Sequence, residues 1–164
     1  MTNIPVYVHA ITIDPDTNSP IMILKETGGD RTLPIWIGLL EATAIATEME
    51  KIEFSRPMTH DFLMNILNAT GIEVTKVEVS TIKDNTYYAF VTLKHGDKEA
   101  KVDARPSDAV AIALRAGVQI FVDESVIEQV RSSSEAVSVK GSTDQKSWAE
   151  ILEELDPGDF KYKM

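Results

Sequence analysis

The chain has no cysteine, which excludes disulfides, thiolate metal sites and cysteine nucleophiles. It also lacks any apolar run approaching the roughly 18 residues of a membrane span. The N-terminus has no basic segment followed by an apolar core, so the sequence predicts no secretory signal. We therefore expect a cytoplasmic protein that does not enter a membrane.

Basic residues are scarce as well, with 16 Lys and Arg against 26 Asp and Glu and a formal charge of −10. Lysine and arginine supply most sequence-independent affinity for phosphates, so this balance argues against a passive nucleic-acid binder. It does not argue against a metal-dependent enzyme. Carboxylates that hold Mg²⁺ or Mn²⁺ allow an acidic surface to meet a phosphodiester through the charge of the cation.

The composition changes near residue 132. The preceding residues, 1–131, are long enough and apolar enough for one domain with its own core. Residues 132–146 contain five serines and one glycine, which predicts a flexible linker. Residues 147–164 carry Trp148, Ile151, Leu152 and Leu155 at helical spacing, which predicts a C-terminal helix that docks on the domain, a second subunit or a partner. Docking within a dimer is the interpretation we favour.

Periodicity in the first 131 residues alternates between strands and helices. Strands are predicted at 4–14, 20–25, 32–37, 73–81, 86–94, 98–104 and 119–122, and helices at 39–49, after the first Arg-Pro and before Gly71, at 107–116 and at 124–131. In the second helix Phe62, Leu63, Ile66 and Leu67 form the expected buried stripe, and Asp61 faces away from the core. The fold class is therefore α+β, with a mixed, mainly antiparallel sheet and helices packed on it.

The dipeptide Arg-Pro occurs twice, in residues 56–61 (RPMTHD) and 103–108 (DARPSD), and each copy runs into a predicted helix. Each copy places an arginine, a hydroxyl suited to capping and an aspartate near a helix N-terminus. Unpaired N–H groups and the helix dipole favour anions there, so a phosphate or a metal-bridged phosphate suits such a place. The repetition is also consistent with an internal duplication.

Purely structural roles are an alternative explanation for the residues of the Arg-Pro motifs and for Trp36. A first-turn aspartate is stabilised by the helix dipole, and a nearby arginine commonly pairs with it. His60 could be a first-turn residue with an exposed ring or a local hydrogen bond. Trp36 follows a proline in a strand suited to a sheet edge, and we expect its large ring in the core rather than against a nucleobase.

Four motifs, in order, resemble the bifunctional nuclease domain family. They are residues 33–38 (LPIWIG), 41–46 (EATAIA), 56–61 (RPMTHD) and 103–111 (DARPSDAVA), and the resemblance covers roughly residues 4 to 130, with the tail from 148 also similar to many bacterial members. The resemblance implies an α+β fold, a homodimer and a nuclease that acts on both DNA and RNA.

Nucleases commonly use one or two divalent cations held by carboxylates. We expect Asp61, Asp103 and Asp108, with Glu41 as a weaker fourth, to bind Mg²⁺ or Mn²⁺. Arg56 and Arg105 would clamp phosphate oxygens through their planar donor forks. His60 would be the general acid or base, beside Asp61 and Asp108 as the catalytic residues.

Two other functions fit the sequence. In a non-enzymatic, dimeric interaction or regulatory module, Arg56 and Arg105 would be used up in buried pairs with Asp61 and Asp108. In a small-anion-binding protein, one helix N-terminus would face a pocket, and a phosphate compound would raise thermal stability without turnover. The nuclease instead requires clustered carboxylates open to solvent.

Overall fold

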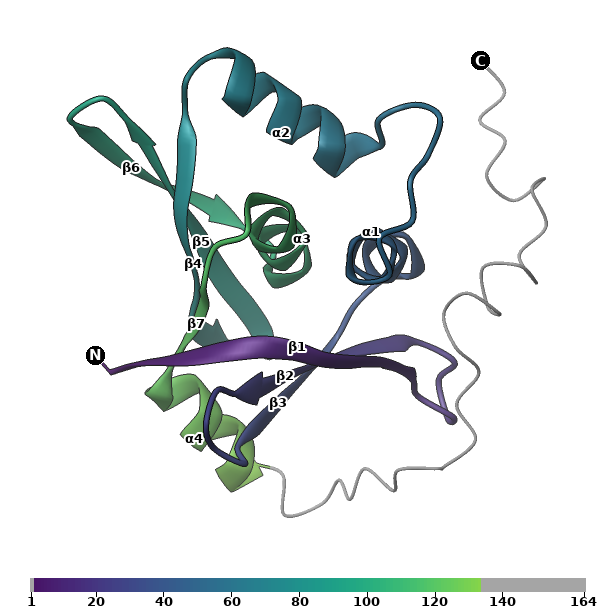
Figure 1. Ribbon diagram of the computed structural model, residues 1–164. Coiled ribbons are helices and arrows are strands. Elements are labelled where there is room, and N and C mark those ends of the chain that lie inside the picture. The colour runs from purple at the N-terminus through teal and green to yellow at the C-terminus, as the bar shows by residue number, and fades with distance from the viewer. Residues whose placement is uncertain (1, 134–164) are drawn as a thin grey trace.

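The computed structural model describes residues 2–133 (Figure 1). The sequence predicts each element in this range to within two residues. In chain order the elements are β1 (Asn3–Ile13), β2 (Pro20–Glu26), β3 (Thr32–Trp36), α1 (Leu39–Met49), α2 (Thr59–Ala69), β4 (Glu73–Lys83), β5 (Thr86–His95), β6 (Lys98–Ala104), α3 (Pro106–Ala116), β7 (Ile120–Asp123) and α4 (Glu124–Ser133). The predicted linker and C-terminal helix lie outside the described residues, except that α4 continues to Ser133.

The strands form one seven-stranded sheet in the order β3-β2-β1-β7-β4-β5-β6. Each half is a three-stranded antiparallel meander, and the short strand β7 joins them, antiparallel to β1 and parallel to β4. The predicted α+β class with a mixed, mainly antiparallel sheet is confirmed. The sequence does not predict the central position of β7, because periodicity identifies a strand but does not say which strands it pairs with.

Turn chemistry sets the edges of the first meander. Gly28, with a φ of 81°, turns the chain between β2 and β3 in a backbone conformation that other residues rarely adopt. β3 contains Pro34, which cannot donate to a ladder, and β3 is indeed an edge strand. Trp36 ends this strand half-exposed, so the expectation that its ring belongs to the core is wrong.

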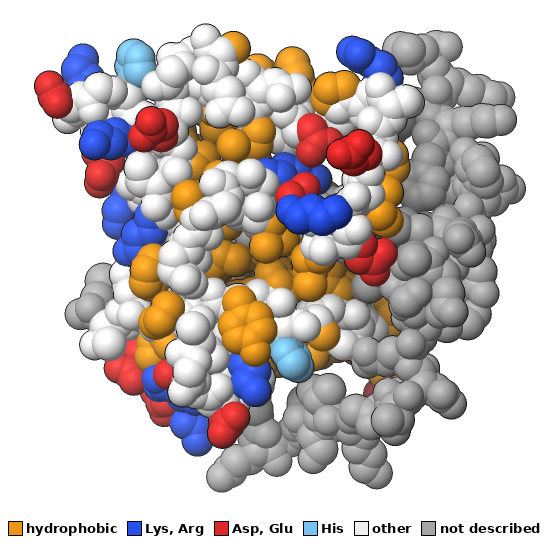
Figure 2. All heavy atoms as spheres, in the orientation of Figure 1, with side chains coloured by type: hydrophobic (Ala, Val, Ile, Leu, Met, Phe, Trp, Pro, Cys, Tyr) orange, Lys and Arg blue, Asp and Glu red, His pale blue; other side chains and the backbone are white. Residues whose placement is uncertain are grey.

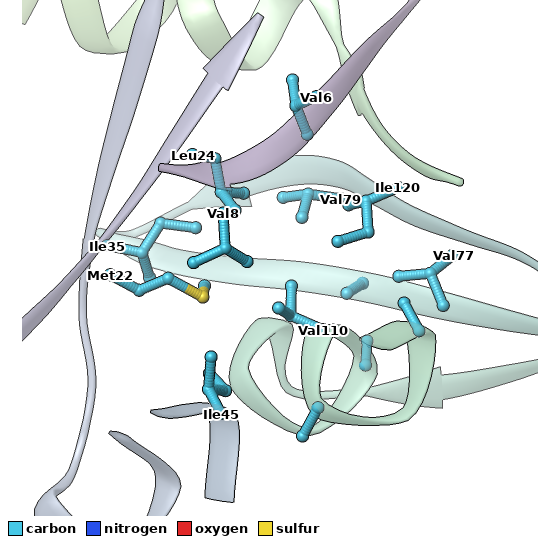
Figure 3. Packing of buried hydrophobic residues seen from close by; sticks show 14 of the residues in the cluster. Val6, Val8, Met22, Leu24, Ile35, Ile45, Val77, Val79, Val110 and Ile120 are labelled. Carbon is cyan, nitrogen blue, oxygen red and sulfur yellow. The ribbon is translucent and has the colours of Figure 1, made fainter. Parts of the chain in front are cut away.

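The core lies between the sheet and the helices α1 and α3 (Figure 3). Ile45 of α1 and Val110 of α3 are fully buried, and they point toward apolar side chains of both meanders, including Met22 and Val79. Alanines at 42, 46, 109 and 113 are also buried, and their small size allows α1 and α3 to pack side by side (Figure 1). These two helices therefore hold the N-terminal and C-terminal halves of the sheet together.

The helix α2 lies across α3 on the side away from the sheet (Figure 1). The predicted buried stripe is wrong for three of its four members: Leu67 is buried, but Phe62, Leu63 and Ile66 are exposed. Asp61 also departs from prediction, because it turns toward Arg115 of α3. Figure 2 shows further hydrophobic side chains in the middle of the side of the molecule that is in view, between the helices and β1. The amphipathic pattern thus marks a helix face that the described residues leave uncovered.

The two Arg-Pro copies occupy different structural positions. Pro106 is the first residue of α3, directly after β6, whereas Pro57 precedes α2 by two residues and follows a helix. Neither helix has a hydroxyl cap, because the residues at the cap positions are Met58 and Arg105. The internal duplication suggested by these motifs is therefore not confirmed. Within residues 2–133, no helix has the length and apolarity needed to cross a membrane.

Candidate functional site

The first turns of α1, α2 and α3 are linked by one chain of polar contacts. Glu41 comes from the first turn of α1, His60 from that of α2 and Asp108 from that of α3, and Arg105 stands at the N-cap of α3. The sheet positions α3 because β6 runs directly into Arg105, where Pro106 fixes the first helical φ angle. Three N-terminal helix ends, each with partial positive charge, are thereby connected.

Asp108 is the centre of this arrangement. Its Oδ1 lies 2.9 Å from His60 Nε2, and its Oδ2 accepts a hydrogen bond of 2.6 Å from Arg105 Nε. Burial acts to raise the pKa of Asp108, but the hydrogen bonds from Arg105 and His60 outweigh it, so the pKa lies below its ordinary value. Asp108 is therefore ionised at neutral pH and accepts from both neighbours.

This contact fixes the proton of His60. An ionised carboxylate only accepts hydrogen bonds, so Nε2 of the imidazole must carry the proton that it donates to Asp108. In the neutral ring the other nitrogen, Nδ1, is then a proton acceptor. The side chain of His60 is mostly buried, which restricts its orientation further. His60 and Asp108 therefore have the arrangement of a general base whose ring is oriented by a carboxylate.

Arg105 joins Asp108 to Glu41, whose Oε1 accepts a bond of 2.6 Å from Arg105 Nη1. The hydrogen bonds from Arg105 to Asp108 and then Glu41 raise the pKa of the guanidinium, so it stays charged. Its side chain is nevertheless 64% exposed. The cation is thus held in place by two carboxylates while it faces solvent.

Asp61 belongs to a second, separate contact. Its Oδ1 accepts a bond of 2.7 Å from Arg115 Nε, and its Oδ2 accepts from the backbone N–H of Met58 at 3.0 Å. Burial acts to raise the pKa of Asp61, but these hydrogen bonds outweigh it and the pKa is lowered. Arg115 is only 8% exposed and also donates to the carbonyls of Ala44 and Ala111, which ties α1, α2 and α3 together.

The structure brings together only some of the predicted site residues. Glu41, His60, Arg105 and Asp108 are connected, and Asp61 neighbours His60 in sequence but pairs with Arg115. Arg56 and Asp103 are exposed, and their side chains make no hydrogen bond or ion pair within the described part of the chain. Between residues 2 and 133, no group of three or more His, Asp or Glu side chains is placed to hold a metal ion.

A pocket of about 390 Å³ opens beside this chain of contacts. Glu41 and Arg105 form one part of its wall, and Trp36 of β3 and Tyr87 of β5 form another. Sequence reasoning missed this use of Trp36, and it missed Arg115 as the residue that fixes Asp61. Spacing within α3 gives no signal for this pair, because Asp61 and Arg115 lie on different helices.

The chain belongs to the bifunctional nuclease domain family, which matches residues 22–135 and so covers the polar contacts and all but Ser19 of the pocket described above. It is 40% identical over 162 residues to Uncharacterized protein Rv1829 of Mycobacterium tuberculosis, an alignment that covers 95% of this chain and 97% of that protein. The family predicted from the four motifs is thus confirmed.

Plant relatives carry a functional name, as two of them illustrate. The chain is 33% identical over 110 residues to Bifunctional nuclease 2 of Arabidopsis thaliana, which covers 65% of this chain and 33% of that protein. It is 27% identical over 116 residues to Bifunctional nuclease 1 of Oryza sativa subsp. japonica, which covers 69% of this chain and 35% of that protein. The similarity to the plant proteins is therefore confined to about a third of their length.

Proposed function

We propose that this protein is a nuclease that hydrolyses phosphodiester bonds of DNA and RNA at the first turns of α1, α2 and α3. The observation that carries the proposal is the Asp108 carboxylate, shared between a histidine at 2.9 Å and an exposed arginine at 2.6 Å. A nuclease needs a group to take a proton from water and a cation to bind the phosphate. Family membership and the names of the plant relatives support the same activity.

Each residue has a defined part in this proposal. His60 accepts the proton of the attacking water at Nδ1, because its Nε2 is committed to Asp108. Asp108 orients the imidazole and stabilises its protonated form. Arg105 binds a phosphate oxygen with the donors that Asp108 and Glu41 do not use. Asp61 has a positioning role, because it bonds Arg115 and the backbone of Met58 and takes no part in the contacts of Arg105.

A divalent cation, Mg²⁺ or Mn²⁺, is part of the proposal. Glu41 and Asp108 are the better placed of the expected ligands, since both carboxylates converge on Arg105, whereas Asp61 belongs to the separate contact with Arg115 and the side chain of Asp103 joins neither contact. Two carboxylates suit Mg²⁺, which usually completes its shell with water and substrate phosphates rather than with a full set of protein ligands. The cation would stabilise negative charge on the phosphate oxygens.

A second function, that of a dimeric interaction module, rests on the exposed apolar face of α2. Phe62, Leu63 and Ile66 are 61%, 42% and 42% exposed, and a contiguous patch of this kind usually marks an interface. We propose that this face forms a homodimer, in a nuclease as well as in a non-catalytic module. Of the buried pairs expected for a purely structural role of the arginines, Arg105 does pair with Asp108, but its side chain is 64% exposed rather than buried. The other expected pair is not formed, because Asp61 pairs with Arg115 instead of Arg56. A cytoplasmic location is also part of this proposal.

The test is hydrolysis of fluorescent single-stranded DNA and RNA by highly purified protein, with Mg²⁺, with Mn²⁺ and with a chelator. We expect Asp108→Asn and His60→Ala each to lower the rate by about 10²-fold to 10⁴-fold, the range for a positioned acid or base. The double variant should lose little more than either single variant, because both changes disable one unit.

The matched control is Asp97→Asn, which changes an exposed aspartate in the turn between β5 and β6. It should retain full activity, and circular dichroism should show that all variants are folded. Equal hydrolysis by wild type and by the Asp108 and His60 variants would point to a contaminating nuclease. Hydrolysis by none of them would instead favour the interaction module.

A further inference from the structure

We propose that the pocket beside Arg105 binds one nucleotide of a single strand, with the base stacked on Trp36 and the adjoining phosphate on Arg105. The inference rests on the proposed function and extends it, because it assigns a substrate-binding site outside the His60–Asp108 pair. The pocket is bounded by the end of β3, the turn between β4 and β5, and the starts of α1 and α3. Its volume of about 390 Å³ lies within the range of small-ligand sites.

Trp36 has the exposure and the fixed orientation that stacking requires. It is 45% exposed, while Leu33 and Ile35 of the same strand are buried, so its ring is turned away from the core. Its Nε1 donates a hydrogen bond of 2.9 Å to Asp14 Oδ2. Because this is the only polar group of the indole, the contact fixes the ring and leaves its aromatic surface for apolar or stacking contacts.

The remaining wall of the pocket contains both apolar and polar groups. Tyr87 is partly buried, and its burial raises the pKa of the phenol, so the ring stays neutral. Asn85 and Ser19 add an amide and a hydroxyl, which can donate to or accept from the edge of a base. An aromatic surface beside adaptable polar groups is the usual surface for an unpaired base.

Arg105 supplies the position for the phosphate. Its contacts with Asp108 and Glu41 use Nε and Nη1, and they leave Nη2 for another acceptor. The N-terminus of α3 has no side-chain cap, so its first-turn dipole adds to the favourable potential for an anion. Arg105 and His60 both bond the Asp108 carboxylate, which connects the pocket to the proposed reaction.

The occupant must be a single strand, because a base within a duplex is already stacked on its neighbours and cannot stack on Trp36. One stacked base and one phosphate contact are also compatible with a chain of net charge −10, which cannot follow a long phosphate backbone with basic residues. The structure therefore assigns a short recognition site rather than an extended groove.

The experiment measures binding of short labelled oligothymidylate and oligouridylate by fluorescence anisotropy, with electrophoresis to verify that the probes are intact. We expect Trp36→Ala to weaken binding of both probes about tenfold, which corresponds to a stacking contribution of about 1.4 kcal/mol. Trp36→Phe keeps an aromatic ring and should recover most of that loss. The two probes distinguish a site that accepts both DNA and RNA from one that requires the 2′-hydroxyl.

Two controls separate stacking from general effects. Tyr7→Ala removes an aromatic side chain of similar exposure, 43%. Tyr7 lies far from Trp36 along β2, because Tyr7 pairs with Lys25 near one end of that strand and Trp36 pairs with Ile21 near the other. Binding by this variant should equal that of the wild type. A probe with abasic sites in place of its bases should bind the wild type more weakly than oligothymidylate does, and this comparison tests the proposal without relying on the folding of any variant.

Unchanged binding by Trp36→Ala, or equal binding of the abasic probe and oligothymidylate by the wild type, would overturn the pocket assignment. No binding of either probe by the wild type would also overturn it. If hydrolysis persists with such a result, the proposed nuclease function stands and only the pocket fails. If binding falls as expected but no preparation hydrolyses the probes, the pocket stands and the nuclease function fails.

Discussion

Asp61 and Asp108 each occupy the third residue of their helix, α2 and α3 respectively. Their surroundings nevertheless differ: Asp61 pairs with a buried arginine and its own helix cap, whereas Asp108 joins a histidine to an exposed arginine. The sequence identifies both as first-turn carboxylates, which local spacing suffices to predict. It does not distinguish their roles, because Arg115 and His60 reach them from other helices.

At this scale we predict that Asp61→Asn lowers stability in a pH-dependent way. The pKa of Asp61 is lowered in the folded protein, so its stabilising effect is complete above the ordinary aspartate pKa of about 3.9. That effect is lost as the pH falls through the lower folded value. The variant should therefore be less stable than wild type by about 1 kcal/mol at neutral pH, a value set by the partial exposure of the pair.

Urea unfolding at a series of pH values from neutral to about 3 measures this difference. The gap between wild type and Asp61→Asn should narrow below about pH 4, as the wild-type carboxyl becomes protonated. Asp97→Asn serves again as the exposed control and should follow the wild type throughout. A gap that stays constant across this pH range would show that the ionised form of Asp61 contributes no stability.

Among the elements, α2 shows most clearly what sequence patterns can and cannot predict. Its bounds follow from periodicity and from Gly71, but its burial does not, because amphipathicity indicates a face without identifying what covers it. The same limit applies to β7, because the sequence predicts a strand there but not its position between β1 and β4. The edge position of β3 is predictable from the sequence, because Pro34 restricts that strand to an edge.

The uncovered face of α2 leads to a prediction about assembly. The wild-type chain should have twice the single-chain mass by light scattering, and the double variant Phe62→Ser, Ile66→Ser should have the single-chain mass because it removes two of the three exposed apolar side chains of the stripe. Since both side chains are exposed, the variant should remain folded.

Asn68→Ser is the matched control for this experiment, because it changes an exposed polar residue on the same helix. It should leave the mass at that of the dimer. A wild-type chain that is monomeric at all accessible concentrations would contradict the assignment of this face as a homodimer interface, as would a serine double variant that stays dimeric.

For the whole molecule, the balance of charge limits how it can meet a polyanion. The net charge of −10 repels nucleic acid, while Arg105 offers one local phosphate contact. A single contact with a single strand releases little counterion, so we expect affinity for oligothymidylate to fall no more than about threefold between about 50 and about 200 mM salt.

A salt titration followed by anisotropy measures this dependence. For Arg105→Gln the slope should be flat or reversed, because screening of the overall repulsion is then the main effect of added salt. A fall of a hundredfold or more for the wild type would require several phosphate contacts, and it would contradict the short recognition site.

The central position of β7 also determines the order in which the sheet can form during translation. Until the ribosome has released residues 120–123, β1 and β4 each present an unpaired strand edge to the cell, and nothing in the sheet joins the two meanders. Open edges of this kind are sites at which nascent chains aggregate. The four residues of β7 therefore end the interval in which the growing polypeptide most needs protection by chaperones.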